Sequence, residues 1–500
     1  MLLGLDIGTT GARALATDEA GTVMASAYAE YPLLTPRPGW TEQNPEDWWE
    51  ATKDVLRRIA TEAGGDFAAV GLTGQMHGSV FLNQAGDVIR PALLWNDQRT
   101  GVQCEQITER VGAERLIAIT GNPALTGFQA PKILWLRDVE PVQYRHVRRV
   151  LLPKDYVRLR LTGETATDVA DASGTLLLDL KARAWSGEIL DALGIPAEWL
   201  PSISESATIT GGLRPSVAAE LGLPAGLPVA AGAGGSAAAA IAAGIVRRGL
   251  ISSSIGTSGV LFAHREGSEP DPSGRLQAFC SAVPGRYHLM AATLSAGGSL
   301  RWWRNLLGGA MDYEELAAIA ETVPVGAEGL FFLPYLSGER TPHLNPEARG
   351  AFIGLRAHHA RAHLTRALME GVVFSLRDGL DAMRDLGVDV QRVRATGGGA
   401  RSRAWRQMQA DIFNLPVESM AADEGPVLGA ALLAGVATGV YRDVQQACDR
   451  TVRIGEVIEP DRDRAAKYGQ LLHKFRALHA ATRASPEMRV PSLTTGSVDD

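Results

Sequence analysis

Cysteine and long apolar runs are scarce in this 500-residue sequence. The three cysteines, Cys104, Cys280 and Cys448, lie far apart and form no CxxC pair, which argues against a disulfide framework or a zinc site. The longest mildly apolar run, AAAAIAAGIV, is too short and too rich in alanine to span a bilayer. No basic, apolar leader follows Met1. We therefore expect a globular protein of the reducing cytoplasm with no membrane partner.

An excess of positive charge is also absent. The chain carries 49 Lys and Arg residues against 56 Asp and Glu residues, a formal net charge of −7. This balance argues against non-specific binding to nucleic acid or to an anionic membrane surface. A chain of 500 residues is too long for a single hydrophobic core. The sequence therefore predicts two or three domains.

One glycine-containing turn occurs twice, at half-chain distance. LLGLDIGTTGARALATDEAG starts at Leu2, and LISSSIGTSGVLFAHREG starts at Leu250. Each copy reads as an apolar strand, a tight turn and a second apolar strand, and the backbone amides of such turns are able to bind phosphate. A single copy is better explained as a plain β-hairpin, but two copies at the heads of two half-chains indicate two similar domains. The candidate phosphate-binding residues are Thr9, Thr10, Gly256, Thr257 and Ser258.

The two copies differ at one position just before the turn. The first carries Asp6 where the second carries Ser254. A carboxylate beside a phosphate-binding turn would repel phosphate unless a cation lay between them. Asp6 is therefore a candidate ligand for Mg²⁺, through water.

Strands and helices alternate after each hairpin, which predicts an α/β fold with mixed sheets. NPEDWWEATKDVLRRIA is expected to form an amphipathic helix, with Asn44 as N-cap and Pro45 at its first position. In RATGGGARSRAW, a strand enters a turn that matches neither GxxxxGK[ST] nor GxGxxG. Its bare backbone allows a nucleotide to approach closely, although a plain tight turn explains it about as well. The candidate nucleotide-binding residues are Gly397, Gly398, Gly399 and Ser402, together with Gly298 in SAGGS.

Two polar segments are candidates for binding a polyol. GLTGQMHG places Gln75, Met76, His77 and Gly78 at the end of a predicted strand. LLWNDQRT adds Trp95, Asp97 and Arg99, an aromatic ring beside a carboxylate and a guanidinium. A structural histidine and a capped turn are the competing interpretations.

Together these motifs resemble those of the FGGY carbohydrate kinases, most closely the xylulokinases, from Leu2 to about Ala480. GFQAPKILWLRDVEP and GAFIGLRAHHARAHLTRALMEG are similar to the two family signatures. The resemblance implies two actin-like, RNase-H-fold domains flanking a central cleft. It implies a sugar-binding domain at residues 1–242 and a nucleotide-binding domain at residues 243–484, followed by a flexible tail at residues 485–500. It also implies transfer of phosphate from MgATP to a ketopentose such as D-xylulose. A homodimer is compatible with this fold.

One segment departs from the family pattern. Xylulokinases resemble one another in a G-G-G-D-N run whose Asp is the general base and whose Asn contacts the sugar. The matching segment here, VAAGAGGSAAAA, has Gly235 at the Asp position and Ser236 at the Asn position. No Asp or Glu lies between Glu220 and Glu266, so a shifted alignment does not restore the carboxylate. A general base contributes about 10²–10⁴-fold to a rate, so its loss would slow the enzyme heavily. Ser236 is expected to cap the following helix and to donate a hydrogen bond to the sugar.

Three functions fit these observations to different degrees. The first is an ATP-dependent, xylulokinase-like sugar kinase in which another group takes the proton. The second is a weak or inactive relative that binds nucleotide and sugar as a sensor or partner. The third, an actin-fold ATPase without a sugar substrate, is disfavoured by GQMHG and LWNDQR. The retained ligand-binding motifs place the kinase first.

Overall fold

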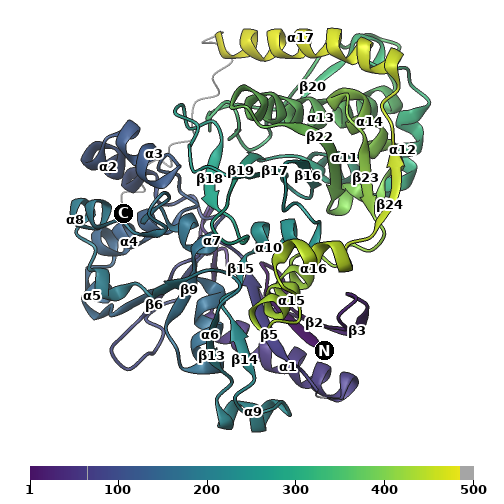
Figure 1. Ribbon diagram of the computed structural model, residues 1–500. Coiled ribbons are helices and arrows are strands. Elements are labelled where there is room, and N and C mark those ends of the chain that lie inside the picture. Colours follow the sequence, from purple (N-terminus) through teal and green to yellow (C-terminus); the bar gives the residue numbers. More distant parts are fainter. Residues whose placement is uncertain (65, 485–500) are drawn as a thin grey trace. The chain divides into compact units, whose positions relative to one another are not determined.

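The computed structural model describes residues 1–64 and 66–484 (Figure 1). The predicted tail, residues 485–500, lies outside the described residues. The chain forms two compact units. The first comprises Met1–Leu250, Phe262–Leu289 and Ala422–Arg453, and the second comprises Ile251–Leu261, Met290–Ala421 and the described residues from Ile454 onward. The domain boundary between residues 242 and 243 stays a prediction.

A seven-stranded mixed sheet is the centre of the first unit. Its order is β13-β14-β5-β1-β2-β3, and the short strand β15 also pairs with β5. The first hairpin is confirmed, because β1 pairs antiparallel with β2, whereas β1 and β5 are parallel. The strands are β1 (Leu2–Ile7), β2 (Gly11–Thr17), β3 (Val23–Glu30), β5 (Ala69–Gly74), β13 (Ile209–Gly212), β14 (Pro228–Ala230) and β15 (Ala233–Gly234).

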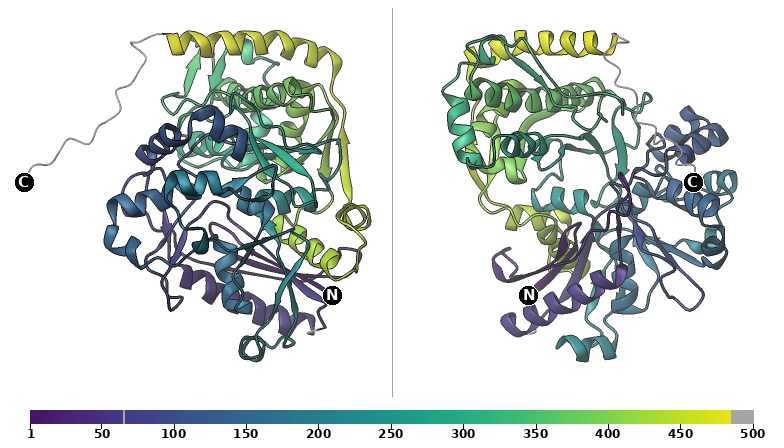
Figure 2. Two further views of the ribbon diagram at one scale, coloured as in Figure 1. Left: turned by 60° about the vertical axis from the view of Figure 1, so that its left-hand side comes forward. Right: turned by 180° about the vertical axis from the view of Figure 1, so that it is seen from behind.

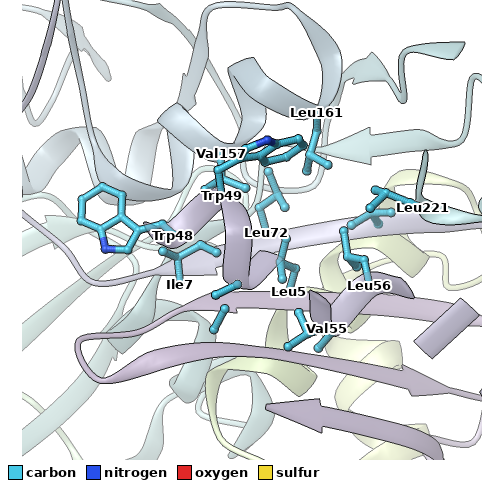
Figure 3. Packing of buried hydrophobic residues seen from close by; sticks show 14 of the residues in the cluster. Leu5, Ile7, Trp48, Trp49, Val55, Leu56, Leu72, Val157, Leu161 and Leu221 are labelled. Carbon is cyan, nitrogen blue, oxygen red and sulfur yellow. The ribbon is translucent and has the colours of Figure 1, made fainter. Parts of the chain in front are cut away.

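Helix α1 (Pro45–Ala63) covers one face of this sheet (Figure 2). As predicted, Pro45 opens the helix and the Asn44 side chain accepts a hydrogen bond from the backbone N–H of Glu46. Trp48 and Trp49 are buried, and they pack with residues of β1 and β5 in one hydrophobic cluster (Figure 3). The apolar stripe of this helix thus forms one part of the core of the first unit.

The opposite face of the sheet packs against helix α15 (Pro426–Ala437), which in turn packs against α10 (Gly235–Ala242). A Cβ on Gly71 would lie 1.8 Å from the carbonyl oxygen of Ala430, so only glycine permits this helix to approach the sheet. A Cβ on Gly429 would lie 1.9 Å from the carbonyl oxygen of Ala238. The alanine run of α10 is therefore a close-packing surface for a second helix.

A second seven-stranded sheet has the order β18-β19-β17-β16-β22-β23-β24. It is also mixed, since β22 and β23 are parallel while β23 and β24 are antiparallel. Its strands are β16 (Gly249–Ile255), β17 (Gly259–Arg265), β18 (Gln277–Cys280), β19 (Tyr287–Thr293), β22 (Val390–Thr396), β23 (Val417–Met420) and β24 (Ile454–Ile458). The principal helices of the second unit are α11 (Gly297–Leu306), α12 (Tyr313–Glu321), α13 (Arg361–Asp385), α14 (Arg403–Phe413) and α17 (Arg462–Ala484).

The predicted α/β class with mixed sheets is confirmed. No helix among the described residues is long and apolar enough to cross a membrane.

Candidate active site

Three parallel strands of the first sheet end at one edge. Asp6 of β1 lies opposite Thr73 of β5, and Thr73 lies opposite Ala233 of β15. The residues that follow these strands include Gln75 and Gly235. The carboxyl ends of parallel strands are the usual place for ligands in α/β folds. Asp6, GQMHG and the glycine-rich turn, predicted as separate candidates, thus converge in one unit.

Asp6 has the properties of a cation ligand. Its carboxylate makes no hydrogen bond or ion pair with any described residue, and Arg13, opposite it in the hairpin, is the charge that lowers its pKa. Burial outweighs this effect and raises the pKa of Asp6 to about 7. A carboxylate without a full charge partner fits Mg²⁺, a hard cation that prefers oxygen ligands.

A chain of hydrogen bonds ties the first turn to the candidate sugar residues. Trp95 donates from Nε1 to Oγ1 of Thr9 at 3.0 Å. Gln43 donates from Nε2 to the carbonyl oxygen of Thr9 at 2.7 Å and accepts a hydrogen bond from Gln75 Nε2 at 2.8 Å. Gln43 belongs to no motif, so it could not be selected from the sequence. Thr10, on the same turn, is exposed.

His77 lies in a backbone conformation that side chains rarely adopt. Its φ is 67°, in the left-handed region, a feature that often marks functional sites. Its Nδ1 lies 2.6 Å from the carbonyl oxygen of Gly174, and its ring meets Phe128 edge-on at 5.0 Å between centroids. A Cβ on Gly78 would lie 2.7 Å from Pro153 Cγ. This turn is therefore fixed from several sides.

Side chains from the first turn of helix α4 (Gln129–Val139) donate hydrogen bonds to carbonyl groups of the His77 turn. Buried Lys132 donates from Nζ to the carbonyl oxygens of His77 at 3.0 Å, Phe128 at 3.1 Å and Gly127. Gln129 donates from Nε2 to the carbonyl oxygen of Gly78 at 2.9 Å. Burial lowers the pKa of Lys132 to about 7. Lys132 was not selected from the sequence, although it belongs to the first signature.

The glycines of the turn before α10 are not equivalent. Gly232 has φ 74°, and a Cβ there would lie 1.8 Å from the carbonyl oxygen of Leu72. A Cβ on Gly234 would lie 2.8 Å from Met76 Cγ and 2.9 Å from Asp171 Oδ1. Gly235 lies outside the left-handed region, and its Cβ would meet only the carbonyl oxygen of Gly74 at 3.1 Å and its carbon at 3.7 Å. The fold thus requires glycine at 232, a side chain at 234 would have to displace Met76 or Asp171, and position 235 can accept a side chain after a small adjustment.

The expected capping role of Ser236 is wrong. Helix α10 begins at Gly235 with Gly234 as N-cap, and no side chain caps it. Ser236 is therefore already inside the helix, because helical geometry starts one residue earlier than the serine would require. It is half-buried, like Gly235.

A cluster of buried charges lies beneath this turn. Its members are Lys154, Asp155 and Arg158 of α6 (Pro153–Thr162), Asp171 of α7 (Val169–Ala172) and Asp168, the N-cap of α7. Lys154 Nζ lies 2.6 Å from Asp155, 2.9 Å from Asp168 and 3.3 Å from Asp171. Arg158 donates to the carbonyl oxygens of Ala230 and Ala231 at the end of β14. No sequence motif marks this cluster, because its members are spread over 18 positions.

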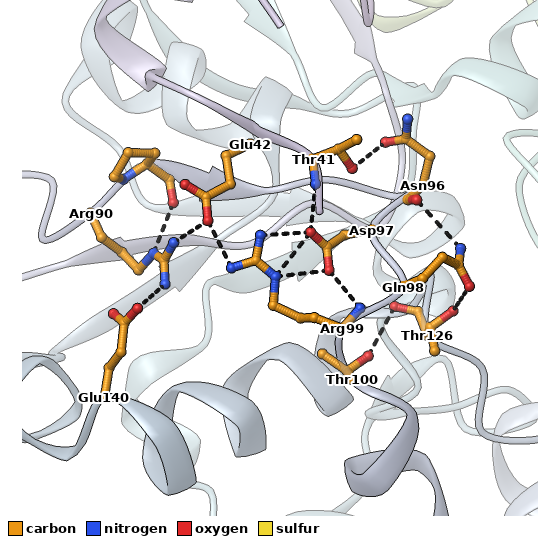
Figure 4. A network of polar contacts seen from close by, with 11 residues as sticks. Thr41, Glu42, Arg90, Asn96, Asp97, Gln98, Arg99, Thr100, Thr126 and Glu140 are labelled. Atoms are coloured by element: carbon orange, nitrogen blue, oxygen red, sulfur yellow. Dashed lines mark hydrogen bonds and ion pairs between the residues drawn. The ribbon is translucent and has the colours of Figure 1, made fainter. Parts of the chain in front are cut away.

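Asp97 and Arg99 belong to an internal network of polar contacts (Figure 4). Their side chains form an ion pair at 2.7 Å and are almost fully buried. Asp97 also accepts the backbone N–H of Thr41 at 2.7 Å, and Arg99 contacts Glu42 at 2.7 Å. Their proposed contact with sugar stays a prediction, but both side chains already have strong internal partners.

The second unit contains a pocket of about 380 Å³. It brings together six predicted nucleotide-binding residues, namely Gly256, Thr257, Gly298, Gly398, Gly399 and Ser402. Its other lining residues combine apolar and polar groups from four helices and their flanks, among them Leu300, Arg301, Tyr313, Glu314, Met369 and Trp405. This volume and this mixture are typical of a small-molecule site.

Close backbone packing shapes this pocket. A Cβ on Gly298 would lie 2.8 Å from the carbonyl oxygen of Thr257, and one on Gly399 would lie 2.6 Å from the Cβ of Ile255. Gly397, with φ 75°, lies against Ser254. Ser402 accepts the backbone N–H of Trp405 and caps α14. The lining omits Ser258 and Gly397, and Thr9 and Thr10 belong to the other unit.

Comparison with protein families decides the relationship. Residues 1–242 match the N-terminal domain of the FGGY family of carbohydrate kinases, and residues 251–438 match its C-terminal domain. The chain belongs to the FGGY family of carbohydrate kinases.

Similar FGGY proteins cover nearly the whole chain. A xylulose kinase from Escherichia coli strain K12 is 41% identical over 481 residues, 96% of this chain and 98% of that protein. A crystal structure described as a xyloylose kinase from Brucella ovis has a TM-score of 0.91 at 38% identity, covering 97% and 99% of the two chains. A structure described as gluconate kinase from Lactobacillus acidophilus also scores 0.91, at 28% identity, covering 97% and 98%. The predicted actin-like FGGY fold is therefore confirmed.

Proposed function

We propose that this FGGY carbohydrate kinase transfers the γ-phosphate of ATP to D-xylulose and releases D-xylulose 5-phosphate. Xylulose kinases at about 40% identity over nearly the whole chain support the choice of sugar. The observation that carries the proposal is the convergence at one sheet edge of Asp6, GQMHG and the glycine-rich turn. The scattered cysteines fit a reaction in the reducing cytoplasm.

The pocket of the second unit is the proposed nucleotide site. Leu300, Met369 and Trp405 offer apolar surface to a base, and the turn at Gly256 and Thr257 offers backbone groups to phosphate. Asp6 would hold Mg²⁺, which supplies charge neutralisation to the phosphates. Sugar binding is assigned to Gln75, Met76, His77, Gly78, Trp95 and Ser236, with Asp97 and Arg99 supporting them from within the fold.

Positioning supplies most of the catalysis in this proposal. Phosphoryl transfer has a loose transition state, so the alignment of the hydroxyl with the γ-phosphate matters more than strong base catalysis. The rigid His77 turn, held by Lys132, would fix the sugar. Without a carboxylate at 235, the rate would fall by about 10²–10⁴-fold unless another group accepts the proton.

A second candidate function rests on Gly235 itself. Because the fold does not require glycine there, its presence has no structural reason in the described residues. A relative that binds ATP and sugar as a sensor, without turnover, would tolerate this residue. We place it second, since the remaining candidate ligand residues are present.

A sugar-dependent assay separates the two functions. Release of ADP is measured with MgATP and a panel of D-xylulose, D-ribulose, gluconate and glycerol. The kinase proposal predicts saturable ADP release that is fastest with D-xylulose. Saturable binding of ATP and D-xylulose by calorimetry, with ADP release no faster than in the absence of sugar, would identify the sensor instead. Faster turnover of another member of the panel would overturn the choice of sugar.

A further inference from the structure

Asp171 is a fully buried carboxylate whose Oδ1 has no hydrogen-bond partner among the described residues. Its closest charged contact is Lys154 Nζ, 3.3 Å from Oδ2. The other two carboxylates around Lys154 are better satisfied. Asp168 accepts the backbone N–H groups of Ala170 and Asp171, and Asp155 lies 2.6 Å from Lys154. A buried oxygen without a partner is costly, so this orientation calls for an explanation.

The unpartnered oxygen is directed at the glycine-rich turn. Asp171 Oδ1 lies 2.9 Å from the position that a Cβ on Gly234 would occupy, directly before Gly235. Met76 Cγ is the other close neighbour of that position, at 2.8 Å. Residues 234 and 235 contribute no side chain to cover the carboxylate. The remaining cover includes Met76, a flexible side chain that has already been assigned to the sugar.

We propose that Asp171 accepts the proton of the attacking sugar hydroxyl, in place of the carboxylate that residue 235 lacks. This inference rests on the proposed kinase function. Sugar binding would displace the Met76 side chain and bring the hydroxyl to Asp171. The hydroxyl oxygen then forms a bond to the γ-phosphorus, and the bond from that phosphorus to the bridging oxygen of ADP breaks. ADP leaves with the electron pair, and the hydroxyl proton passes to the Asp171 carboxylate.

The charges around Asp171 suit a proton acceptor. Lys154 and Arg158 face it with two positive charges, and Asp155 and Asp168 add two further carboxylates. Burial raises the pKa of Asp171 to about 8, against the opposing effect of Lys154. The ionised fraction therefore grows as the pH rises through 8. A base of this strength binds the transferred proton firmly.

A double-mutant cycle tests the role of Asp171. Asp171→Asn is made in the parent protein and in a Gly235→Asp protein, and kcat for D-xylulose is measured in all four. We expect a loss of about 10²-fold in the parent but less than about threefold beside Asp at 235, because that carboxylate then takes the proton. Asp155→Asn, in the same charge cluster but without the Gly234 contact, is the matched control. It should lower the melting temperature without a 10²-fold loss of kcat.

Other outcomes overturn the inference in distinguishable ways. Equal losses in both backgrounds would make Asp171 a structural residue. Turnover only in the Gly235→Asp proteins would show that the parent has no working base. Absence of turnover in all four would overturn the proposed function and the inference together. If Asp171→Asn fails to fold, the pH profile decides. The parent should accelerate through pH 8 and the Gly235→Asp protein at lower pH, whereas superimposable profiles would contradict the proposal.

Discussion

Gly234 and Gly235, in the turn before α10, differ in how much space their surroundings leave for a side chain. The space at Gly234 is taken by Met76 and Asp171, whereas Gly235 has ordinary backbone angles and one tight neighbour. We expect Gly234→Ala to cost about 1–3 kcal/mol in the free energy of unfolding, because the core is overpacked. Gly235→Ala should change it by less than about 0.5 kcal/mol, since alanine is favoured in a helix.

Urea unfolding of the two alanine variants beside the parent measures this difference. Equal destabilisation by both substitutions would show that glycine at 235 is a structural requirement. In that case residue 235 could not carry a carboxylate side chain, and its glycine would have a structural explanation.

Helix α4 acts at the scale of an element, because its first turn holds the His77 turn. Lys132→Met removes three hydrogen bonds to carbonyl oxygens, including that of His77. We expect the KM for D-xylulose to rise about tenfold, which corresponds to a loss of roughly 1.4 kcal/mol of binding energy. The KM for ATP should stay unchanged, because the proposed nucleotide pocket lies in the other unit.

Steady-state kinetics with each substrate varied in turn check this split. Lys181→Met, at an exposed lysine of the same unit, is the control and should leave both constants unchanged. A parallel rise of both KM values would mean that Lys132 stabilises the fold in general rather than the sugar side.

Elements with local signals were the ones that the sequence predicted well. Asn44 and Pro45 mark the start of α1, and the two IGT[TS]G turns mark the hairpins. The capping role of Ser236 failed, because α10 begins at Gly235 and the serine already lies inside the helix. Asp171, Lys132 and Gln43 were missed since each acquires its role from a partner distant in the sequence. Asp97 and Arg99 look like ligand residues in sequence, yet their strongest contacts are internal.

The pH dependence of stability is a property of the whole molecule. The contribution of one buried histidine, His288, can be measured separately by substitution. The His288 ring is stacked on Phe262 at 4.2 Å, and burial lowers its pKa to about 3 from an ordinary 6.5. The unfolded chain therefore binds the proton first as the pH falls. Stability from this group is fully present above pH 6.5 and is lost toward pH 3, by up to about 1.4 kcal/mol per pH unit.

Thermal unfolding of the parent and of a His288→Phe variant between pH 7.5 and 4.5 measures this effect. Buried carboxyl groups with raised pKa values, such as Asp171, act in the opposite direction but are common to both proteins. The parent should lose stability relative to the variant as the pH falls below 6.5. A constant difference across this range would show that His288 does not titrate below its ordinary pKa.

At the scale of the whole molecule, the central proposal is that a chain with glycine at position 235 still transfers phosphate from ATP to a sugar. Direct detection of the product tests this most sharply. A high concentration of the purified protein is incubated with MgATP and D-xylulose, and the products are followed by phosphorus NMR. We expect D-xylulose 5-phosphate and ADP to accumulate together, and only when both substrates are present. Saturable binding of both ligands without any sugar phosphate would contradict this proposal and would make this member of the FGGY family a ligand-binding protein.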